Sequence, residues 1–274
     1  MDPLHFHSIV ARDLDLQNPM PAARLDELAR ACGVRDGLRV LDVGSGKGSL
    51  LRRWAGRFEI VGTGLELNPS FAADARARAE REGVGHRITV VEGPALDFAP
   101  APGAYDVVAC IGAPFAIGSF DEAVAWMHAA LRPGGSLVIG DRYLAEPFAP
   151  GASGVLPEVA ALRDLSALHR VLERSGLSVT ALFGSSVPDM DRYVSAWWTA
   201  AHDWAREHPD HPERAELLAT VNDRRERYLA HERRHVGWAV WVARSAALAA
   251  PRPPHPQGST AVTTPRGATA RAWS

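Results

Sequence analysis

Three glycines at alternate positions, Gly44, Gly46 and Gly48, form the part of this chain best suited to hold a ligand. They follow the short apolar run at residues 40–43, and an apolar pattern resumes at residue 50. Glycine is needed where a backbone turns sharply or lies against a ligand, because a Cβ atom would collide there. The pattern therefore predicts a buried strand, a tight loop and a helix, the entry of a nucleotide-binding α/β unit.

An acidic residue ends the next predicted strand. Residues 60–65 are apolar or glycine, Glu66 follows them, and Asn68-Pro69 opens the next helix. A carboxylate at this position can accept hydrogen bonds from both hydroxyl groups of a ribose. NAD-dependent enzymes and methyltransferases share this feature, so the glycines and Glu66 do not separate the two classes.

Three further details separate them. Ser49 stands where the dinucleotide fingerprint has its third glycine, and Asp42 lies two residues before the first glycine. Residues 131–140 predict a helix end, a Pro-Gly-Gly turn and a fifth strand. Together the motifs resemble the class I S-adenosylmethionine (SAM) dependent methyltransferase superfamily, and in particular small-molecule bacterial methyltransferases. The matching segments lie between residues 35 and 145, at 40–48, 64–69, 105–113 and 131–141.

The resemblance implies that the cofactor is SAM, that the product is S-adenosylhomocysteine (SAH), and that no metal is needed. The glycines would let the backbone lie against the tail and ribose of SAM. Asp42 would orient the loop or bind the cofactor's ammonium group. The residues implied in cofactor binding are Asp42, Gly44, Ser45, Gly46, Gly48, Glu66, Leu67, Ala95, Leu96, Asp97, Ile111 and Gly112.

At the adenine end, this chain departs from the family pattern. Many members have a Gly-Asp-Ala triplet after strand three, whereas this chain has Gly93-Pro94-Ala95. Proline offers no side-chain acceptor, so the adenine amino group needs another partner. Asp97 or a backbone carbonyl near Ala95 and Leu96 could supply it. The alternative is that Asp97 is an ordinary loop carboxylate that faces water.

Methyl transfer from a sulfonium is an in-line displacement that needs a base only where the acceptor must lose a proton. His7, Asp141 and Tyr143 are the candidate catalytic residues, because the N-terminal segment and the exit of strand five usually frame the acceptor pocket. For each of them, the role of an ordinary surface or loop residue is the commoner one. The histidines at 202, 208 and 211 predict a polar turn rather than a metal site, because prolines interrupt the segment.

The composition excludes several partners. Among 274 residues, 46% are hydrophobic and 23% charged, an ordinary globular balance, and the net charge of -2 does not favour nucleic acid. The Asn/Asp-Pro-Pro-aromatic tetrad of nucleic-acid amine methyltransferases is absent after Ile111. Cys32 and Cys110 predict buried thiols in a reducing compartment. No apolar run reaches the length of a membrane span, so we expect a cytoplasmic protein with no membrane partner, and a homodimer is possible.

Strands that alternate with helices predict an α/β fold. We expect a Rossmann-like, seven-stranded, mostly parallel sheet with helices on both faces and a helical insertion before the last strand. The expected divisions are an N-terminal segment and helix (1–34), the SAM-binding core (35–187), the insertion (188–234), the final strand (235–248) and a disordered tail (249–274). We also expect residues 1–20 to be irregular and residues 158–174 to form one helix.

The insertion begins where strand six ends, at the edge of the sheet where ligands bind in this fold, so it could form a lid over the acceptor. Its tryptophans at 197, 198 and 204 could wall an acceptor pocket, although core packing is the commoner use of such a stripe. The function expected from these features is methyl transfer from SAM to a small molecule. The alternatives are a SAM-fold regulatory or binding protein without turnover and, less favoured, an NAD-dependent dehydrogenase.

Overall fold

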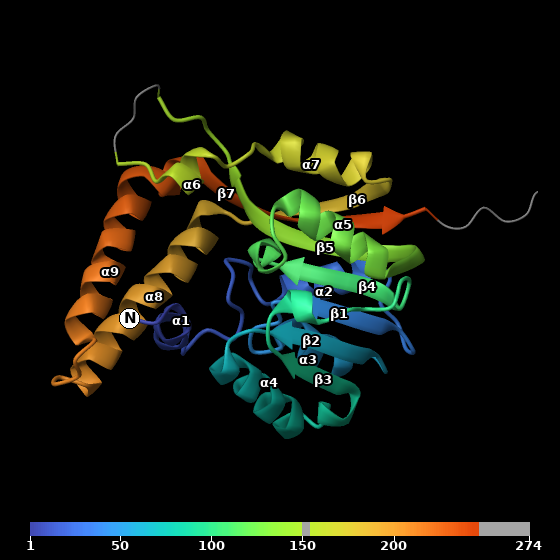
Figure 1. Cartoon of the computed structure of the whole chain (residues 1–274), viewed down its shortest axis with the longest axis horizontal. Helices are drawn as coiled ribbons and strands as arrows, with labels where there is room; N and C mark the ends of the chain where they lie inside the picture. Colours follow the sequence, from blue (N-terminus) through green and yellow to red (C-terminus); the bar gives the residue numbers. More distant parts are fainter. Residues whose placement is uncertain (150–153, 247–274) are drawn as a thin grey trace, which may run out of the picture.

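A seven-stranded sheet forms the centre of the computed structural model, which describes residues 1–149 and 154–246 (Figure 1). The strand order is β3-β2-β1-β4-β5-β7-β6, and only β7 runs antiparallel to both of its neighbours. This arrangement confirms the predicted Rossmann-like, mostly parallel sheet. The strands are β1 (Arg39–Val43), β2 (Val61–Glu66), β3 (Ile88–Glu92), β4 (Tyr105–Ile111), β5 (Leu131–Leu144), β6 (Leu177–Gly184) and β7 (Val236–Ser245).

Helices cover both faces of the sheet, and each face has its own apolar core. On one face α5 (Phe120–Ala130) and α7 (Leu165–Arg174) pack against β4, β5 and β7. On the other face the core includes α2 (Arg24–Cys32), α3 (Ser49–Ala55) and Ala79 of α4 (Pro69–Arg81). The strands contribute alternate side chains to the two cores, as a sheet covered on both faces requires.

The helix starts follow the sequence signals closely. The Asn68 side chain accepts a hydrogen bond from the backbone N–H of Ser70 at 3.0 Å and so caps α4, with Pro69 at the first helical position. Ser119 and Glu122 form the predicted capping box at the start of α5. These interactions pair backbone N–H groups that have no partner inside the helix.

The N-terminal segment was predicted to be irregular, but it contains helix α1 (Pro3–Val10). The Asp2 side chain caps this helix by accepting from the backbone N–H of His5 at 2.9 Å. Phe6, Ile9 and Val10 are buried at helical spacing against α8 and α9 of the insertion. The apolar partners that stabilise α1 lie about two hundred positions away, so the local sequence alone does not reveal them.

Two other boundaries differ from the predictions. The single helix expected at 158–174 is divided into α6 (Pro157–Ala160) and α7, because Asp164 caps a new start by accepting from Ala167 N at 2.7 Å. Strand β5 begins at Leu131 rather than 136, with an irregular register opposite Tyr105 and Val107. Gly134, at φ +74°, lets the chain pass through the Pro-Gly-Gly sequence without leaving the sheet.

Between β6 and β7 the chain forms α8 (Val187–Glu207), α9 (Arg214–Arg227), a π-helical turn η4 (Tyr228–Glu232) and the short α10 (Arg233–His235). A third apolar cluster joins α1, α8 and α9, and these three helices lie off the end of the sheet toward which β4 points (Figure 1). Short 3₁₀ turns η1 (Gly85–Arg87), η2 (Ala95–Asp97) and η3 (Pro114–Ala116) flank β3 and β4. The tail predicted at 249–274 lies outside the described residues, which contain no helix long and apolar enough to cross a membrane.

Candidate cofactor and acceptor site

The glycine loop after β1 has the tight geometry predicted for it. Gly44 and Gly46 have φ angles of +66° and +56°, a region that residues with a Cβ rarely adopt. A Cβ on Gly44 would overlap the Ala113 side chain beyond β4, and one on Gly46 would overlap the Gln17 side chain. The backbone N–H of Ser45 donates to the Leu65 carbonyl at 2.9 Å, which holds the loop against the end of β2.

Glu66 lies directly beside this loop and is buried. Its two carboxylate oxygens accept from the backbone N–H groups of Gly46 and Asn68, each at 2.7 Å. Burial raises the pKa of Glu66, while these backbone hydrogen bonds act in the opposite direction. A carboxylate has about four lone-pair sites, so Glu66 can accept ribose hydroxyls while it keeps the loop in place.

Asp42 is buried at the end of β1, below the loop. Burial, followed by repulsion from Glu66, raises its pKa to about 8. A cation beside Asp42 would stabilise the charged form and lower that pKa. The environment of Asp42 therefore fits both roles implied for it, support of the loop and contact with an ammonium group.

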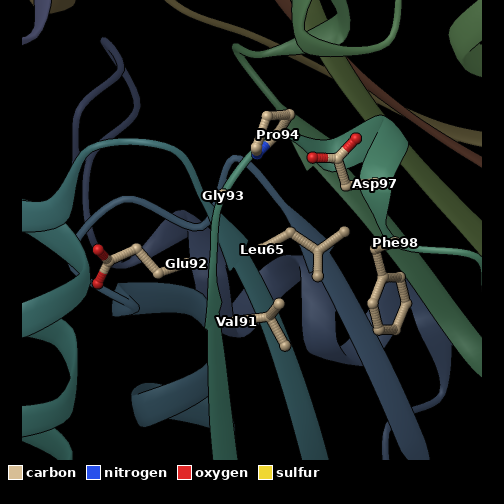
Figure 2. A pocket seen from close by; sticks show the side chains of 7 residues that line it. All are labelled: Leu65, Val91, Glu92, Gly93, Pro94, Asp97 and Phe98. Atoms are coloured by element: carbon tan, nitrogen blue, oxygen red, sulfur yellow. The ribbon is translucent and has the colours of Figure 1, made fainter.

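A small cavity of about 140 Å³ lies where β2 and β3 end, at the position expected for adenine. Leu65, Val91 and Phe98 provide its apolar lining, and the Asp97 carboxylate points toward Pro94 (Figure 2). Nearby in the chain, Leu67 and Leu96 expose large apolar side chains. Asp97 thus lines a cavity beside the proline that replaces the usual acid. Because Asp97 is also exposed, both roles considered for it, a partner for adenine and a loop carboxylate that faces water, stay open.

The end of β4 contacts the final strand and the N-terminal segment. A Cβ on Gly112, which has φ +92°, would lie 2.9 Å from the ring of Trp238 and 3.8 Å from Asn18. Ile111 is half-buried at this end, and its neighbour Gly140 pairs with it across the sheet. A side chain at position 112 would therefore meet the Trp238 ring, so this turn requires a glycine.

Residues 11–18 lie on the glycine loop, a feature that the sequence analysis missed. The buried Lys47 ammonium donates to the carbonyls of Ala11 and Arg12 at 2.9 and 2.7 Å, and Ser49 donates to the Asp15 carbonyl at 2.5 Å. The Gln17 side chain accepts from the backbone N–H of Lys47 at 3.3 Å. A lysine inside a glycine loop was the available signal, since a buried ammonium requires oxygen partners.

The insertion is connected to the same segment. The Tyr193 hydroxyl on α8 donates to the Gln17 carbonyl at 3.1 Å, and Met190 packs against the core on the α2 face of the sheet. Trp204 is buried between α1 and α9, so it serves the core packing considered in the sequence analysis. Trp197 is only partly buried, and its ring contacts those of His7 and Tyr193 at 5.4 and 5.6 Å.

The three candidate catalytic residues are not brought together. His7 lies against Trp197, and burial, with a smaller effect from Arg224, lowers its pKa. Asp141 accepts from the backbone N–H of Arg142 at 2.7 Å, and burial raises its pKa. The Tyr143 ring lies over Gly237 and packs against the core beneath α5 and α7. No hydrogen bond or ring contact within the described ranges links His7 to Asp141 or Tyr143.

The cysteines and histidines have ordinary surroundings. Cys32 and Cys110 are buried thiols, as predicted, and burial raises the pKa of Cys32 to about 12. The His208 ring stacks on Trp204 with 4.5 Å between the ring centroids. In the described part of the chain, no three His, Cys, Asp or Glu side chains are grouped to hold a metal ion.

Comparison with known proteins shows which family the chain belongs to. The sequence pattern of the family described as "Methyltransferase domain" matches residues 40–135. The chain is 30% identical to the Escherichia coli protein YjhP over 245 residues, which is 88% of this chain and 98% of YjhP. A SAM-dependent methyltransferase of Geobacter sulfurreducens, solved with SAH, superposes with a TM-score of 0.79 at 29% identity, over 87% of this chain and 97% of that protein. This chain is a class I SAM-dependent methyltransferase.

A further relative is the erythromycin 3''-O-methyltransferase of Saccharopolyspora erythraea. It is 33% identical over 140 residues, which cover 51% of this chain and 45% of that protein.

The family assignment makes SAM the cofactor of this methyltransferase, and the site fits it. The buried Ser45 hydroxyl has no hydrogen-bond partner among the described residues, and the left-handed glycine loop has backbone where a side chain could not fit.

Proposed function

We propose that this methyltransferase acts on a small-molecule acceptor at the end of the sheet that α1 and α8 cover. The observation that carries the proposal is the Tyr193–Gln17 hydrogen bond, which joins the insertion to the segment lying on the glycine loop. A site at the end of the sheet that two helices cover suits a small acceptor better than a polymer. The name of the erythromycin 3''-O-methyltransferase, which refers to a small molecule, agrees with this assignment.

Bound SAM supplies a methyl group on a sulfonium centre, and transfer forms a bond between this carbon and the acceptor atom while the carbon–sulfur bond breaks to leave SAH. The loop at Gly44 and Gly46 would hold the tail of SAM, Glu66 its ribose and Asp97 its adenine. Leu67 and Leu96 offer exposed apolar surface for the adenine ring.

His7 is the candidate base for acceptors that lose a proton. Because burial lowers its pKa, its ring is neutral near pH 7 and can accept a proton. Asp141 and Tyr143 are the other candidates. Tyr143 packs against the core on the α5 face, and among the described residues no contact links either of them to His7.

We also propose that α8 and α9 form the lid inferred from the length of the insertion. The lid would exclude water from the transfer site, while the partly buried Trp197 and Tyr193 line its inner side. The third apolar cluster supports this role, because it fastens α1 to the lid as one unit.

The test is turnover over a panel of metabolites that offer hydroxyl, amine, thiol and activated carbon acceptors. SAH formation is followed by mass spectrometry, with oligonucleotides and a protein extract as polymer substrates in parallel. We expect SAH to form with one class of small molecule and not with either polymer. SAM binding accompanied by methylation of the polymers alone would contradict the proposal.

A further inference from the structure

The chain between α1 and α2 crosses the glycine loop as a strap, which we define as residues 12–17. The strap is neither helix nor strand, and none of its residues is buried. Ala11 before it and Asn18 after it are both buried. A segment that is fixed at both ends and buries little between them can open locally at a small cost in free energy.

The strap covers the part of the site expected to hold the tail of SAM. Lys47 and Ser49 of the loop region each donate to a carbonyl of the strap, at 2.7 and 2.5 Å. The Gln17 side chain lies so close to Gly46 that a Cβ on this glycine would overlap its Oε1. The strap is therefore held by side chains of the site that it covers.

Helix α1 covers the other end of the site. The Asn68 amide donates to the Leu4 carbonyl and to the Ser8 hydroxyl of α1, each at 3.0 Å. The backbone N–H of Asn68 in turn donates to Glu66, the residue expected to bind the ribose. Helix α1 and the strap therefore bridge the cofactor site from its ribose end to its tail end.

One carboxylate joins the strap to the helices beneath it. Asp15 accepts from the Arg52 guanidinium at 2.5 Å and from that of Arg78 at 3.1 Å. Arg52 on α3 is buried and also pairs with Glu82, whereas the Asp15 side chain is 53% exposed. Water can therefore replace the arginines as partners of Asp15 when the strap lifts, so this contact can break and form again.

Packing beneath the strap is incomplete. Leu16 is only partly buried against the core on the α2 face. Beside it lies a cavity of about 480 Å³, lined by Asp15 and Leu16 of the strap and by residues of α2 and α3, among them Leu25 and Arg53. Protein interiors are normally close-packed, so a cavity of this size means that apolar packing contributes little to holding the strap closed.

The strap is also joined to the lid. The Arg12 guanidinium donates two hydrogen bonds to Glu207, at 2.6 and 3.0 Å, and the Tyr193 hydroxyl donates to the Gln17 carbonyl at 3.1 Å. Glu207 and Tyr193 both belong to α8. The strap can therefore keep these contacts and move with α8 when it parts from the glycine loop.

We infer that the strap is a gate for the cofactor, which opens at Asp15 to admit SAM and to release SAH. Opening breaks the contacts with Arg52, Arg78 and the glycine loop, and closure returns Gln17 to the loop. Because the closed strap and α1 bridge the site, the opening step limits cofactor exchange at high cofactor concentration. The inference concerns exchange alone and needs no acceptor, so it does not depend on the proposed substrate class.

The experiment follows SAH binding to the full chain by stopped-flow fluorescence, and SAH release by displacement with excess SAM. For the original protein, the observed binding rate should level off as the SAH concentration rises, because opening becomes limiting. Asp15→Asn keeps the carbonyl that Ser49 binds but weakens the contacts with the two arginines. It should raise the plateau rate and the release rate about threefold to tenfold each, and change the dissociation constant less than either rate.

Asp13→Asn is the matched control. It removes an exposed carboxylate of the same strap that pairs with Arg12 rather than with α3 or α4. Both of its rates should equal those of the original protein, since the contacts of Asp15 are kept. The comparison separates loss of the Asp15 contacts from a general effect of removing negative charge from the strap.

Hydrogen exchange of the peptide that contains the strap gives a second measure of opening. Bound SAH should slow the exchange of its amides, and Asp15→Asn should quicken it in the free protein. Unchanged rates in Asp15→Asn, or a binding rate that rises linearly over the whole range of SAH concentration, would overturn the inference. Failure of the original protein to bind SAH would contradict the cofactor site and the gate together, whereas failure to methylate small molecules would leave the gate intact.

Discussion

The Glu66 carboxylate accepts a hydrogen bond from the backbone N–H of Gly46 at 2.7 Å, across twenty residues of sequence. The residue expected to bind ribose therefore also holds the loop expected to bind the tail of SAM. Because the same carboxylate accepts from Asn68 N, the start of α4 is tied to this pair. The cofactor site is thus a connected unit rather than two separate motifs.

Glu66→Ala is expected to weaken SAM binding by about 1.5–3 kcal/mol, the usual value of hydrogen bonds to a charged group. Loss of the loop contact should also lower the melting temperature. Calorimetric titration with SAM measures the first effect. Glu59→Ala removes an exposed carboxylate elsewhere and is the control. A change of only a few tenths of a kcal/mol in SAM binding would mean that the ribose binds elsewhere.

Gly46→Val is expected to abolish measurable SAM binding, with a loss of at least about 100-fold, or ~2.7 kcal/mol. The side chain would strain a left-handed residue and would overlap Gln17 on the loop. Gly83→Ala is the matched control, because Gly83 has a similar φ of +72° but open space around it. The control should lose stability without losing SAM affinity, and retained micromolar binding by Gly46→Val would refute the assignment of the loop.

Asp42 should make the stability of the unliganded protein depend on pH. Its pKa rises from 3.8 to about 8 on folding, so its contribution is complete below 3.8 and is lost as the pH rises through 8. The loss is at most about 1.4 kcal/mol per pH unit. Asp42→Asn mimics the neutral acid and should flatten the decline in melting temperature between about pH 4 and 8. Asp13→Asn, at an exposed carboxylate, should leave the decline unchanged.

The same residue predicts proton release on cofactor binding. If the ammonium group of SAM lies beside Asp42, it lowers that raised pKa, and binding at pH 7 releases a fraction of a proton. Calorimetry in buffers of different ionisation enthalpy measures this release. An observed enthalpy of SAM binding that is the same in all buffers would mean that Asp42 only supports the turn.

His7→Gln is expected to reduce the rate of methyl transfer about 10²- to 10⁴-fold for an acceptor that must lose a proton. SAM affinity should change little, because His7 contacts Trp197 rather than the glycine loop. His5→Gln is the control, because His5 lies on the same helix as His7 and contacts Glu213 at the start of α9. Equal rates for His7→Gln and the original protein would exclude His7 as the base.

Tyr193→Phe tests the lid by removing one hydrogen bond. The lid would lose its link to the Gln17 carbonyl, so turnover should fall about two- to tenfold, in line with one neutral hydrogen bond. Tyr228→Phe removes a hydroxyl that donates to Asp191 inside the insertion and should reduce stability instead. If both variants lower the melting temperature and neither lowers turnover, the insertion is scaffold.

The sequence by itself determined the parts of this protein that depend on local geometry. The glycine loop, the Asn68 cap and the Ser119 capping box could be predicted because each uses residues a few positions apart whose backbone requirements few amino acids meet. Short apolar runs that alternate with helices likewise indicated the sheet, and the position of Glu66 at the end of β2 followed from it.

Only the tertiary structure decided what covers that site. Lys47 binds carbonyls some 35 positions earlier, and Tyr193 binds one 176 positions earlier. The same applies to α1, whose helical apolar pattern is stabilised only by α8 and α9. No local pattern encodes such contacts, because they depend on how the packed sheet and helices bring distant side chains together.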